Sequence, residues 1–248
     1  PLAGTCVHGI FEEIDFTAVR EASPVVAFGE RIDYELRAHD LSTRGNEAPA
    51  ENERVRDVAA MIGNVLTTPL PCGDERIELA DIGPAARTSE MPFHFPARRI
   101  NDRMALLRAL SDAAGQDLAG EAPLWDRLEF SPFRGVFRGF IDLVFQHNGR
   151  YYLLDWKSNY LGAREEDYTP DNLRREMTAS LYTVQYALYT LALHLHLKQR
   201  LPGYSYEEHL GGALYLFVRG VSPEQPSCGV FFARPERAAM SRLEEMLQ

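Results

Sequence analysis

The sequence predicts an α/β domain in which a central mixed β-sheet is flanked by helices. Segments with apolar residues at helical spacing alternate with short runs rich in β-branched and aromatic residues, which is the order expected when helices pack on a sheet. Two β-rich runs meet at Asn148-Gly149, and such a dipeptide is the strongest short-range signal of a β-hairpin. Residues 172–197 form the longest amphipathic stretch, which predicts one long helix.

The N-terminal half carries two helical patterns followed by two strand patterns. Apolar residues recur every three or four positions in the helical segments, and prolines follow the second helix. Residues 37–53 are polar, almost without large apolar side chains, and predict an exposed loop. We therefore expect helices over residues 4–20 and 53–66, and strands over residues 76–82 and 86–95.

The C-terminal half continues the alternation. A short helical pattern comes first, the hairpin strands follow, and the long amphipathic helix leads into two further β-rich runs and a closing helix. We expect helices over residues 104–114, 172–197 and 235–247, and strands over residues 136–146, 150–157, 212–218 and 229–233.

Length and composition are typical of one globular domain. The chain has 248 residues, of which 45% are hydrophobic and 25% charged, and both values are ordinary for soluble proteins. No apolar run approaches the roughly 20 residues of a membrane span, and the start lacks a secretory signal, so we expect a cytoplasmic protein. Since an initiator Met is also absent, we interpret residues 1–248 as a single domain excised from a longer chain.

Charge and cysteine content exclude some classes of site. The three cysteines are far apart and form no CxxC pair, which argues against a disulfide framework and a zinc site. Lys and Arg number 26 against 36 Asp and Glu, so the net charge is 26 − 36 = −10. A protein that captures nucleic acid from solution is normally basic, so any DNA-related function must account for this acidity.

The hairpin expected at residues 139–162 brings charged side chains together. A two-residue turn at Asn148-Gly149 requires positive φ at both positions and sets a register in which Asp142 lies directly opposite Asp155. Such neighbours have Cβ atoms roughly 4.5–5.5 Å apart, where like charges repel. Lys157 points to the same face as Asp155. Because both strands are otherwise apolar, we expect a divalent cation on the carboxylate oxygens to supply the remaining positive charge.

Two other interpretations of the hairpin stay open on the residues alone. The first is a purely structural cluster of two aspartates and a lysine. The second is a glycosidase that uses both aspartates, because retaining glycosidases place such carboxyls about 5–5.5 Å apart; the adjacent Lys157 and a total of two tryptophans argue against a sugar cleft. In the same register Trp156 faces away from the carboxylates and is expected in the core.

These residues carry a family resemblance. G-F-I-D at residues 139–142 and D-W-K at residues 155–157 resemble the D…(D/E)xK core of the restriction-endonuclease-like nucleases. His8 in GTCVHGIFE, Glu90 in SEMPF, and the QxxxY pair Gln185 and Tyr189 complete an ordered set that is similar to the RecB-type branch. The resemblance runs from Gly4 to about Val221 and implies a restriction-endonuclease-like core.

The resemblance implies a magnesium-dependent deoxyribonuclease with one ion, whose place Mn²⁺ or Ca²⁺ can take. Asp142 and Asp155 would bind this ion together with His8 and the main-chain carbonyl of Trp156. Mg²⁺ prefers oxygen ligands, whereas a histidine ligand shifts the preference toward Mn²⁺.

The remaining motif residues would act on water and DNA. The resemblance implies that Lys157 positions the attacking water and stabilises the charge that develops on the scissile phosphate. Glu90 would support the metal or the water. Gln185 and Tyr189, four residues apart on one side of a helix, would line the DNA-binding side of the site.

The resemblance also implies partners. They are a single DNA strand fed by a helicase during double-strand-break processing, RecC and RecD subunits in a parent helicase–nuclease complex at the bacterial nucleoid, and the recombinase RecA. No GxxxxGK[ST] loop is present, so we expect no ATP binding in this domain. Tethering to a helicase raises the local concentration of DNA, which accounts for the acidic charge. The alternative is a non-catalytic module that docks a recombinase on a nuclease fold.

Overall fold

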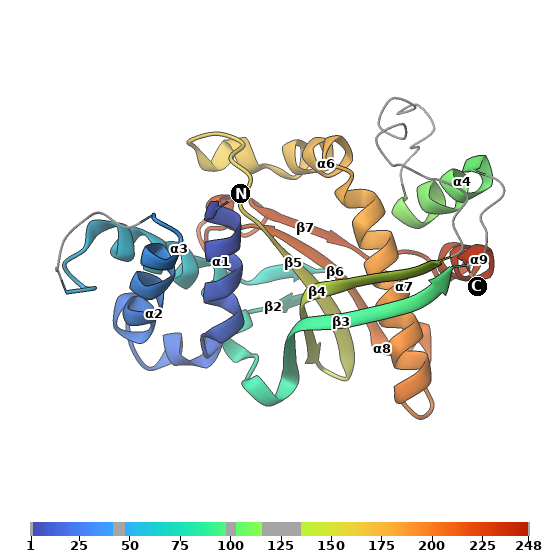
Figure 1. Ribbon diagram of the computed structural model, residues 1–248, viewed down its shortest axis with the longest axis horizontal. Coiled ribbons are helices and arrows are strands. Elements are labelled where there is room, and N and C mark those ends of the chain that lie inside the picture. Colours follow the sequence, from blue (N-terminus) through green and yellow to red (C-terminus); the bar gives the residue numbers. More distant parts are fainter. Residues whose placement is uncertain (1, 42–47, 98–102, 116–134, 248) are drawn as a thin grey trace.

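A five-stranded mixed sheet forms the centre of the fold, as predicted (Figure 1). The computed structural model describes residues 2–41, 48–97, 103–115 and 135–247. The strand order is β3-β4-β5-β6-β7; β5 and β6 are parallel, and the other neighbours are antiparallel. The strands are β3 (Arg87–Ala97), β4 (Gly135–His147), β5 (Arg150–Lys157), β6 (Leu210–Phe217) and β7 (Val230–Ala233).

Helices cover both faces of this sheet. One face packs against α1 (Leu2–Glu13), α2 (Pro24–Ala38), α3 (Glu53–Thr67) and a small ribbon of β1 (Leu70–Cys72) and β2 (Glu75–Ile77). The other face packs against α4 (Arg103–Ala114), α6 (Pro170–Ala179), α7 (Tyr182–Arg200) and α9 (Arg237–Leu247). Within the described ranges no helix is long and apolar enough to cross a membrane.

Short helices occupy the connections. A single-turn helix, α8 (Tyr206–His209), leads into β6. The 3₁₀ turns are η1 (Phe16–Arg20), η2 (Leu79–Asp81), η3 (Pro84–Ala86), η5 (Glu165–Tyr168) and η6 (Val218–Gly220).

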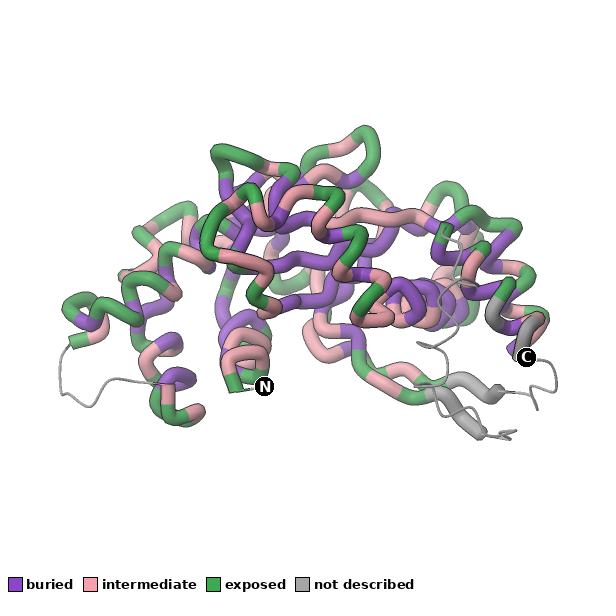
Figure 2. Tube along the Cα trace, turned by 90° about the horizontal axis from the view of Figure 1, so that it is seen from above, coloured by how far each residue is buried: buried purple, intermediate pink, exposed green. Residues whose placement is uncertain are grey.

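The sheet separates two hydrophobic cores, and the alternation along β5 shows the division. Leu153 belongs to the core with α7, whereas Leu154 and Trp156 belong to the core with α1. Successive side chains of a strand point to opposite faces, so Asp155 and Lys157 share the α7 side with Leu153. Figure 2 shows the buried chain concentrated along the central strands, with exposed residues on the outer sides of the helices.

The hairpin of β4 and β5 has the predicted geometry. Asn148 and Gly149 have φ values of 48° and 78°, as a two-residue turn with positive φ at both positions requires. His147 pairs with Arg150, and the register continues unbroken to Leu143 opposite Leu154.

Most predicted elements are confirmed with small shifts of their ends, but the N-terminal region differs. The helix expected over residues 4–20 ends at Glu13, because the Asp15 side chain accepts a hydrogen bond from the Thr17 N–H and starts η1. The strand expected over residues 76–82 is cut short by η2.

One helix was not predicted. α2 begins with Pro24 at its first turn and buries Phe28, Ile32 and Leu36, which follow one another at intervals of four residues. α2 extends into the segment expected to be a loop over residues 37–53, and part of that segment lies outside the described residues.

The prediction of one helix over residues 172–197 is wrong. The chain forms α6 and α7, separated at Ser180 and Leu181. Leu181 adopts the left-handed conformation, with φ 59° and ψ 20°, which is uncommon for a residue other than glycine and does not continue a right-handed helix. The apolar stripe that suggested one helix is real, but the backbone turns at this point.

Candidate active site

Three acidic residues lie side by side on neighbouring strands. The β3–β4 pairs on either side of Glu90 place it level with Asp142. The last β4–β5 pair is Leu143 with Leu154, so the next pair in the same register would be Asp142 with Asp155. Asp155 is in turn the partner of Tyr215 on β6. Glu90 has φ 48°, so β3 bends where its carboxylate enters this row. The sheet therefore carries a row of carboxylates across β3, β4 and β5.

The β4–β5 ladder opens at the two aspartates. Its last backbone pair is Leu143 with Leu154. Beyond it, Asp142 Oδ2 accepts a hydrogen bond of 2.8 Å from the Trp156 N–H, so a side chain takes the place of a backbone acceptor. The regular β4–β5 pairing therefore ends next to Asp142 and Asp155, at what we call the opening of the hairpin.

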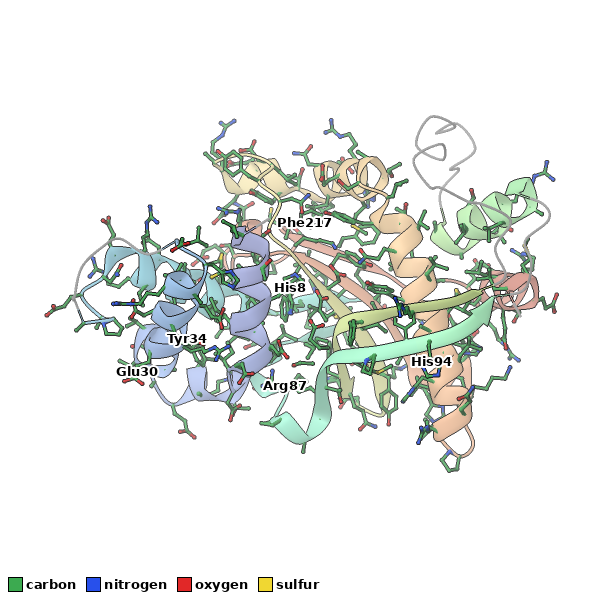
Figure 3. All side chains as sticks on the ribbon, in the orientation of Figure 1. His8, Glu30, Tyr34, Arg87, His94 and Phe217 are labelled. Atoms are coloured by element: carbon green, nitrogen blue, oxygen red, sulfur yellow. The ribbon has the colours of Figure 1, made fainter. Side chains whose placement is uncertain are left out.

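Trp156 attaches α1 to this opening. As predicted, its side chain is buried in the core, where it stacks on Phe11 with ring centroids 3.9 Å apart. His8 lies three residues before Phe11, on the same side of the helix, and faces the strands (Figure 3). His8 Nε2 lies 3.1 Å from the Trp156 carbonyl oxygen, and His8 Nδ1 lies 3.5 Å from Asp142 Oδ2.

His8, Glu90 and Asp142 can hold a metal ion. One ligand atom from each lies within 4.8 Å of the others, and this is the group with metal-ligand geometry among the described residues. With its hydrogen on Nε2, donated to the Trp156 carbonyl, His8 turns the lone pair of Nδ1 toward the Asp142 carboxylate. A proton or a cation must then lie between these two acceptors, and a backbone partner on the second nitrogen is the usual way to orient a histidine ligand.

The pKa values of all three carboxyl groups are raised when no ion is bound. Burial raises the pKa of Asp142 to about 8, and the negative charge of Asp155 adds to this shift. Burial also raises the pKa of Asp155 against the opposing charge of Lys157, and burial followed by the charge of Glu12 raises the pKa of Glu90. All three shifts indicate a deficit of positive charge, which a divalent cation would remove.

Asp155 belongs to a second, connected network. Its side chain is buried, and Oδ2 lies 2.5 Å from the Lys157 Nζ. Gln185 of α7 joins the two, because Nε2 donates to Asp155 Oδ1 at 3.1 Å and Oε1 accepts from Lys157 at 3.1 Å. The same Nε2 donates to the Tyr189 hydroxyl at 3.0 Å, and the Tyr189 ring packs edge-on against Phe93.

The structure thus gathers the predicted residues around the opening of the hairpin. Their grouping differs from the expected ligand set, because Glu90 shares the cluster with His8 and Asp142, while Asp155 faces Lys157. The Trp156 carbonyl, expected as a ligand, lies against His8 Nε2.

Sequence reasoning missed the aromatic surroundings of Lys157. The Lys157 Nζ lies 3.9 Å from the ring centroid of Tyr182 and 5.2 Å from that of Tyr215. Tyr182 precedes Gln185 by three residues, hence lies on the same side of the helix. A signal existed in this spacing, but the prediction of one uninterrupted helix hid the fact that Tyr182 begins α7.

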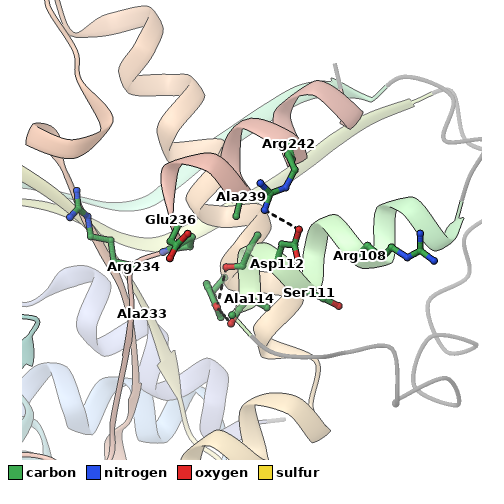
Figure 4. A pocket seen from close by; sticks show the side chains of 13 residues that line it. Arg108, Ser111, Asp112, Ala114, Ala233, Arg234, Glu236, Ala239 and Arg242 are labelled. Atoms are coloured by element: carbon green, nitrogen blue, oxygen red, sulfur yellow. Dashed lines mark hydrogen bonds and ion pairs between the residues drawn. The ribbon is translucent and has the colours of Figure 1, made fainter.

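A pocket lies elsewhere on the molecule (Figure 4). It encloses about 690 Å³ and is formed by α4, β7 and α9, with Arg108, Arg234 and Arg242 among its lining residues. It shares no residue with the predicted site. Arg242 is paired with Asp112 at 2.9 Å across this pocket, and the pocket borders Gly115, the last described residue of its segment.

Comparison with known proteins decides the family. The family model of the PD-(D/E)XK nuclease superfamily matches residues 1–248. The chain belongs to this superfamily. The predicted restriction-endonuclease-like core is confirmed, and the glycosidase hypothesis is set aside.

Relatives place this PD-(D/E)XK nuclease domain more closely. It is 36% identical over 245 residues to the RecBCD enzyme subunit RecB of Escherichia coli, which covers 98% of this chain and 19% of that protein. The corresponding subunit of Haemophilus influenzae is 42% identical over 168 residues, covering 68% of this chain and 13% of that protein. The RecB subunit of Mycobacterium tuberculosis is 34% identical over 266 residues, covering 98% of this chain and 23% of that protein. The chain thus spans about a fifth or less of most of these relatives' length and is a nuclease domain of a RecB-like protein.

Proposed function

We propose that this domain hydrolyses phosphodiester bonds of DNA, chiefly single strands, with Mg²⁺ as its ion. The supporting observation is the row of carboxylates on three neighbouring strands, with the Lys157 ammonium at one end and His8 above the opening. Phosphodiester hydrolysis requires an activated water and neutralisation of negative charge, and a bound divalent ion contributes to both.

One ion would be held at the opening of the hairpin. His8, Glu90 and Asp142 supply nitrogen and oxygen atoms close enough for a shared ion, and Asp155 and the Trp156 carbonyl border the same opening. Oxygen donors suit Mg²⁺, and His8 makes Mn²⁺ an effective substitute, with Ca²⁺ able to occupy the site.

The remaining polar residues would orient the ammonium and the DNA. Lys157 offers a fixed positive charge near the scissile phosphate, where negative charge grows as water attacks. Asp155 and Gln185 hold this ammonium from two sides. Tyr189, held by Gln185, would line the path of the strand.

The identity to RecB subunits supports a wider proposal. The domain would act within a helicase–nuclease that processes double-strand breaks in the bacterial cytoplasm, at the nucleoid, alongside RecC and RecD subunits. RecA is a further proposed partner. Tethering to a helicase would deliver the strand at high local concentration, which suits a domain with a net charge of −10.

A direct assay tests the activity. The domain is incubated with internally labelled single-stranded DNA in Mg²⁺, in Mn²⁺, or in EDTA. We expect release of labelled nucleotides with Mg²⁺ and Mn²⁺, and none in EDTA, because the buried carboxylates require an ion. A domain that releases nothing with either ion, yet binds a recombinase, would instead be the non-catalytic docking module.

The acidity of the domain predicts weak DNA binding. We expect the isolated domain to bind single-stranded DNA in Ca²⁺ only weakly, because its net charge of −10 opposes the phosphate backbone. The affinity should fall steeply as salt increases, because salt competes with the contacts that basic side chains make to phosphates. Fluorescence anisotropy at several salt concentrations measures this. Nanomolar affinity at physiological salt would contradict the tethering argument.

A further inference from the structure

The Lys157 ammonium is enclosed on several sides. Its side chain is 11% exposed, and Nζ faces Asp155 Oδ2 and Gln185 Oε1. The face of the Tyr182 ring closes a third side at 3.9 Å, with Tyr215 further away at 5.2 Å. A cation on the face of an aromatic ring is attracted by the ring quadrupole, most strongly when water is excluded. An ammonium has three N–H groups, and the described contacts give oxygen acceptors for two of them, Asp155 and Gln185.

Tyr182 is itself held in place by a polar chain. Its hydroxyl donates to Asn159 Oδ1 at 3.2 Å, and Asn159 Nδ2 donates to Glu176 Oε1 at 2.7 Å. Ser180 Oγ donates to the same Glu176 oxygen at 2.7 Å. The end of α6, the loop after Lys157 and the start of α7 are therefore tied together at the hydroxyl of this ring.

The backbone next to Tyr182 is strained. Leu181 holds the left-handed conformation between α6 and α7. In a residue other than glycine, this conformation persists only where the surrounding structure enforces it. The turn at Leu181 changes the direction of the chain just before Tyr182. A continuous helix would carry Tyr182 along the axis of α6 instead of along the axis of α7.

We propose that Tyr182 is a positioning residue for Lys157, and that the strained α6–α7 junction exists to place its ring against the ammonium. This inference rests on the proposed role of Lys157 at the scissile phosphate. The ring fixes the direction of the ammonium without accepting one of its N–H groups, so the third N–H stays available for a phosphate oxygen. A hydrogen-bond acceptor at this position would occupy that N–H.

Two lysines make a direct test possible. Lys157 and Lys198 are the only two lysines of the chain. Lys198 lies on the surface, where it pairs with Glu244. With lysine labelled by ¹³C at Cε, NMR should show two signals, one of them displaced upfield by the Tyr182 ring current. Tyr182→Phe should keep the displaced signal, and Tyr182→Leu should move it toward that of Lys198. Two unshifted lysine signals in the unaltered domain would overturn the proposal, whether or not DNA is cut.

The rates of DNA hydrolysis by Tyr182 variants test whether the ring matters for activity. We expect Tyr182→Leu to lower kcat about 10- to 30-fold with KM and the activating metal concentration unchanged within about twofold, and Tyr182→Phe to lose no more than about threefold. Tyr204→Leu, a half-buried tyrosine beside His194, is the matched control and should retain full activity. Equal losses in the Phe and Leu variants would contradict a role for the ring.

Two further variants separate the proposal from general damage. Fluorination of Phe at position 182 weakens the ring face while preserving its shape, so kcat should fall stepwise with each added fluorine. In a Lys157→Ala background, Tyr182→Leu should cause no further loss, because the two residues act as one unit. A fluorine series without effect, or a full additional loss in the Lys157→Ala background, would overturn the proposal. Absence of DNA cleavage by the unaltered domain would overturn the proposed function and leave the NMR result standing.

Discussion

Replacing Asp155 by alanine is expected to lower the rate of DNA hydrolysis by on the order of 10³-fold or more. Asp155 connects the two networks of the site, because it borders the opening where Asp142 lies and also contacts Lys157 and Gln185. The alanine variant loses a candidate ligand of the ion and at the same time releases the ammonium. Initial rates on single-stranded DNA at saturating Mg²⁺ measure the loss.

Matched variants show whether the charge or the fold is responsible. Asp155→Asn preserves the shape of the side chain and should be almost as inactive, because a neutral amide lacks the negative charge that holds a divalent ion and the Lys157 ammonium. Asp171→Ala removes an aspartate whose side chain is 85% exposed on α6 and should leave the rate unchanged. Activity of Asp155→Ala within tenfold of the unaltered domain would contradict the hydrolytic role.

The second large effect concerns Asp142 and has opposite signs for activity and stability. Asp142→Asn should remove nearly all hydrolysis, yet stabilise the metal-free protein above pH 7. In the unfolded chain this carboxyl ionises near its ordinary pKa, whereas in the folded protein burial raises the pKa of Asp142 to about 8. The folded state therefore holds more protons than the unfolded state between about pH 4 and pH 8, and stability falls as pH rises through this window.

Thermal unfolding in EDTA from pH 5 to pH 9 tests this sign. The melting temperature of the unaltered domain should decline toward pH 8, and that of Asp142→Asn should decline less. Addition of Mg²⁺ or Mn²⁺ should restore the melting temperature of the unaltered domain most at high pH, because the ion binds the ionised carboxylate. A melting temperature that rises from pH 5 to pH 8 in EDTA would contradict the assignment.

Local sequence signals predicted the hairpin and its charged residues well. Asn148-Gly149 determines the turn, the turn determines the register, and the register brings Asp142 and Asp155 to one place. The side of Trp156 also follows from alternation along the strand. These inferences succeed because each depends on residues close together in the sequence, where backbone geometry leaves few alternatives.

The predictions that proved wrong concern elements whose form depends on contacts between different segments of the chain. Periodicity alone cannot detect the turn at Leu181, because the apolar stripe continues through it. The hydrogen bond from Tyr182 to Asn159, 23 residues away, is likewise invisible to it. α2 was overlooked although Phe28 and Ile32 have helical spacing. Its apolar face gains stability from packing on α1 and α3, and helix propensity is a weak guide in such cases.

Composition held one further signal for the site. Of the 26 basic residues only two are lysines, so the remaining 24 are arginines. An ammonium is a compact point charge, whereas a guanidinium is wider and planar, so the rare lysines of such a chain are candidate positions for a compact ammonium. Lys157 is one of the two and is enclosed by Asp155 and Tyr182, whereas Lys198 lies on the surface.

The contact of His8 with the Trp156 carbonyl joins segments 148 residues apart, so the proposed metal site is complete only after distant parts of the chain have been synthesised and folded together. During synthesis α1 leaves the ribosome long before β4 and β5, and these strands leave it before α7 with Gln185. Until synthesis has passed all three, a nascent copy lacks part of the proposed site. Removal of α1 would likewise take His8 away from the Trp156 carbonyl, so the proposed hydrolysis should be lost with it.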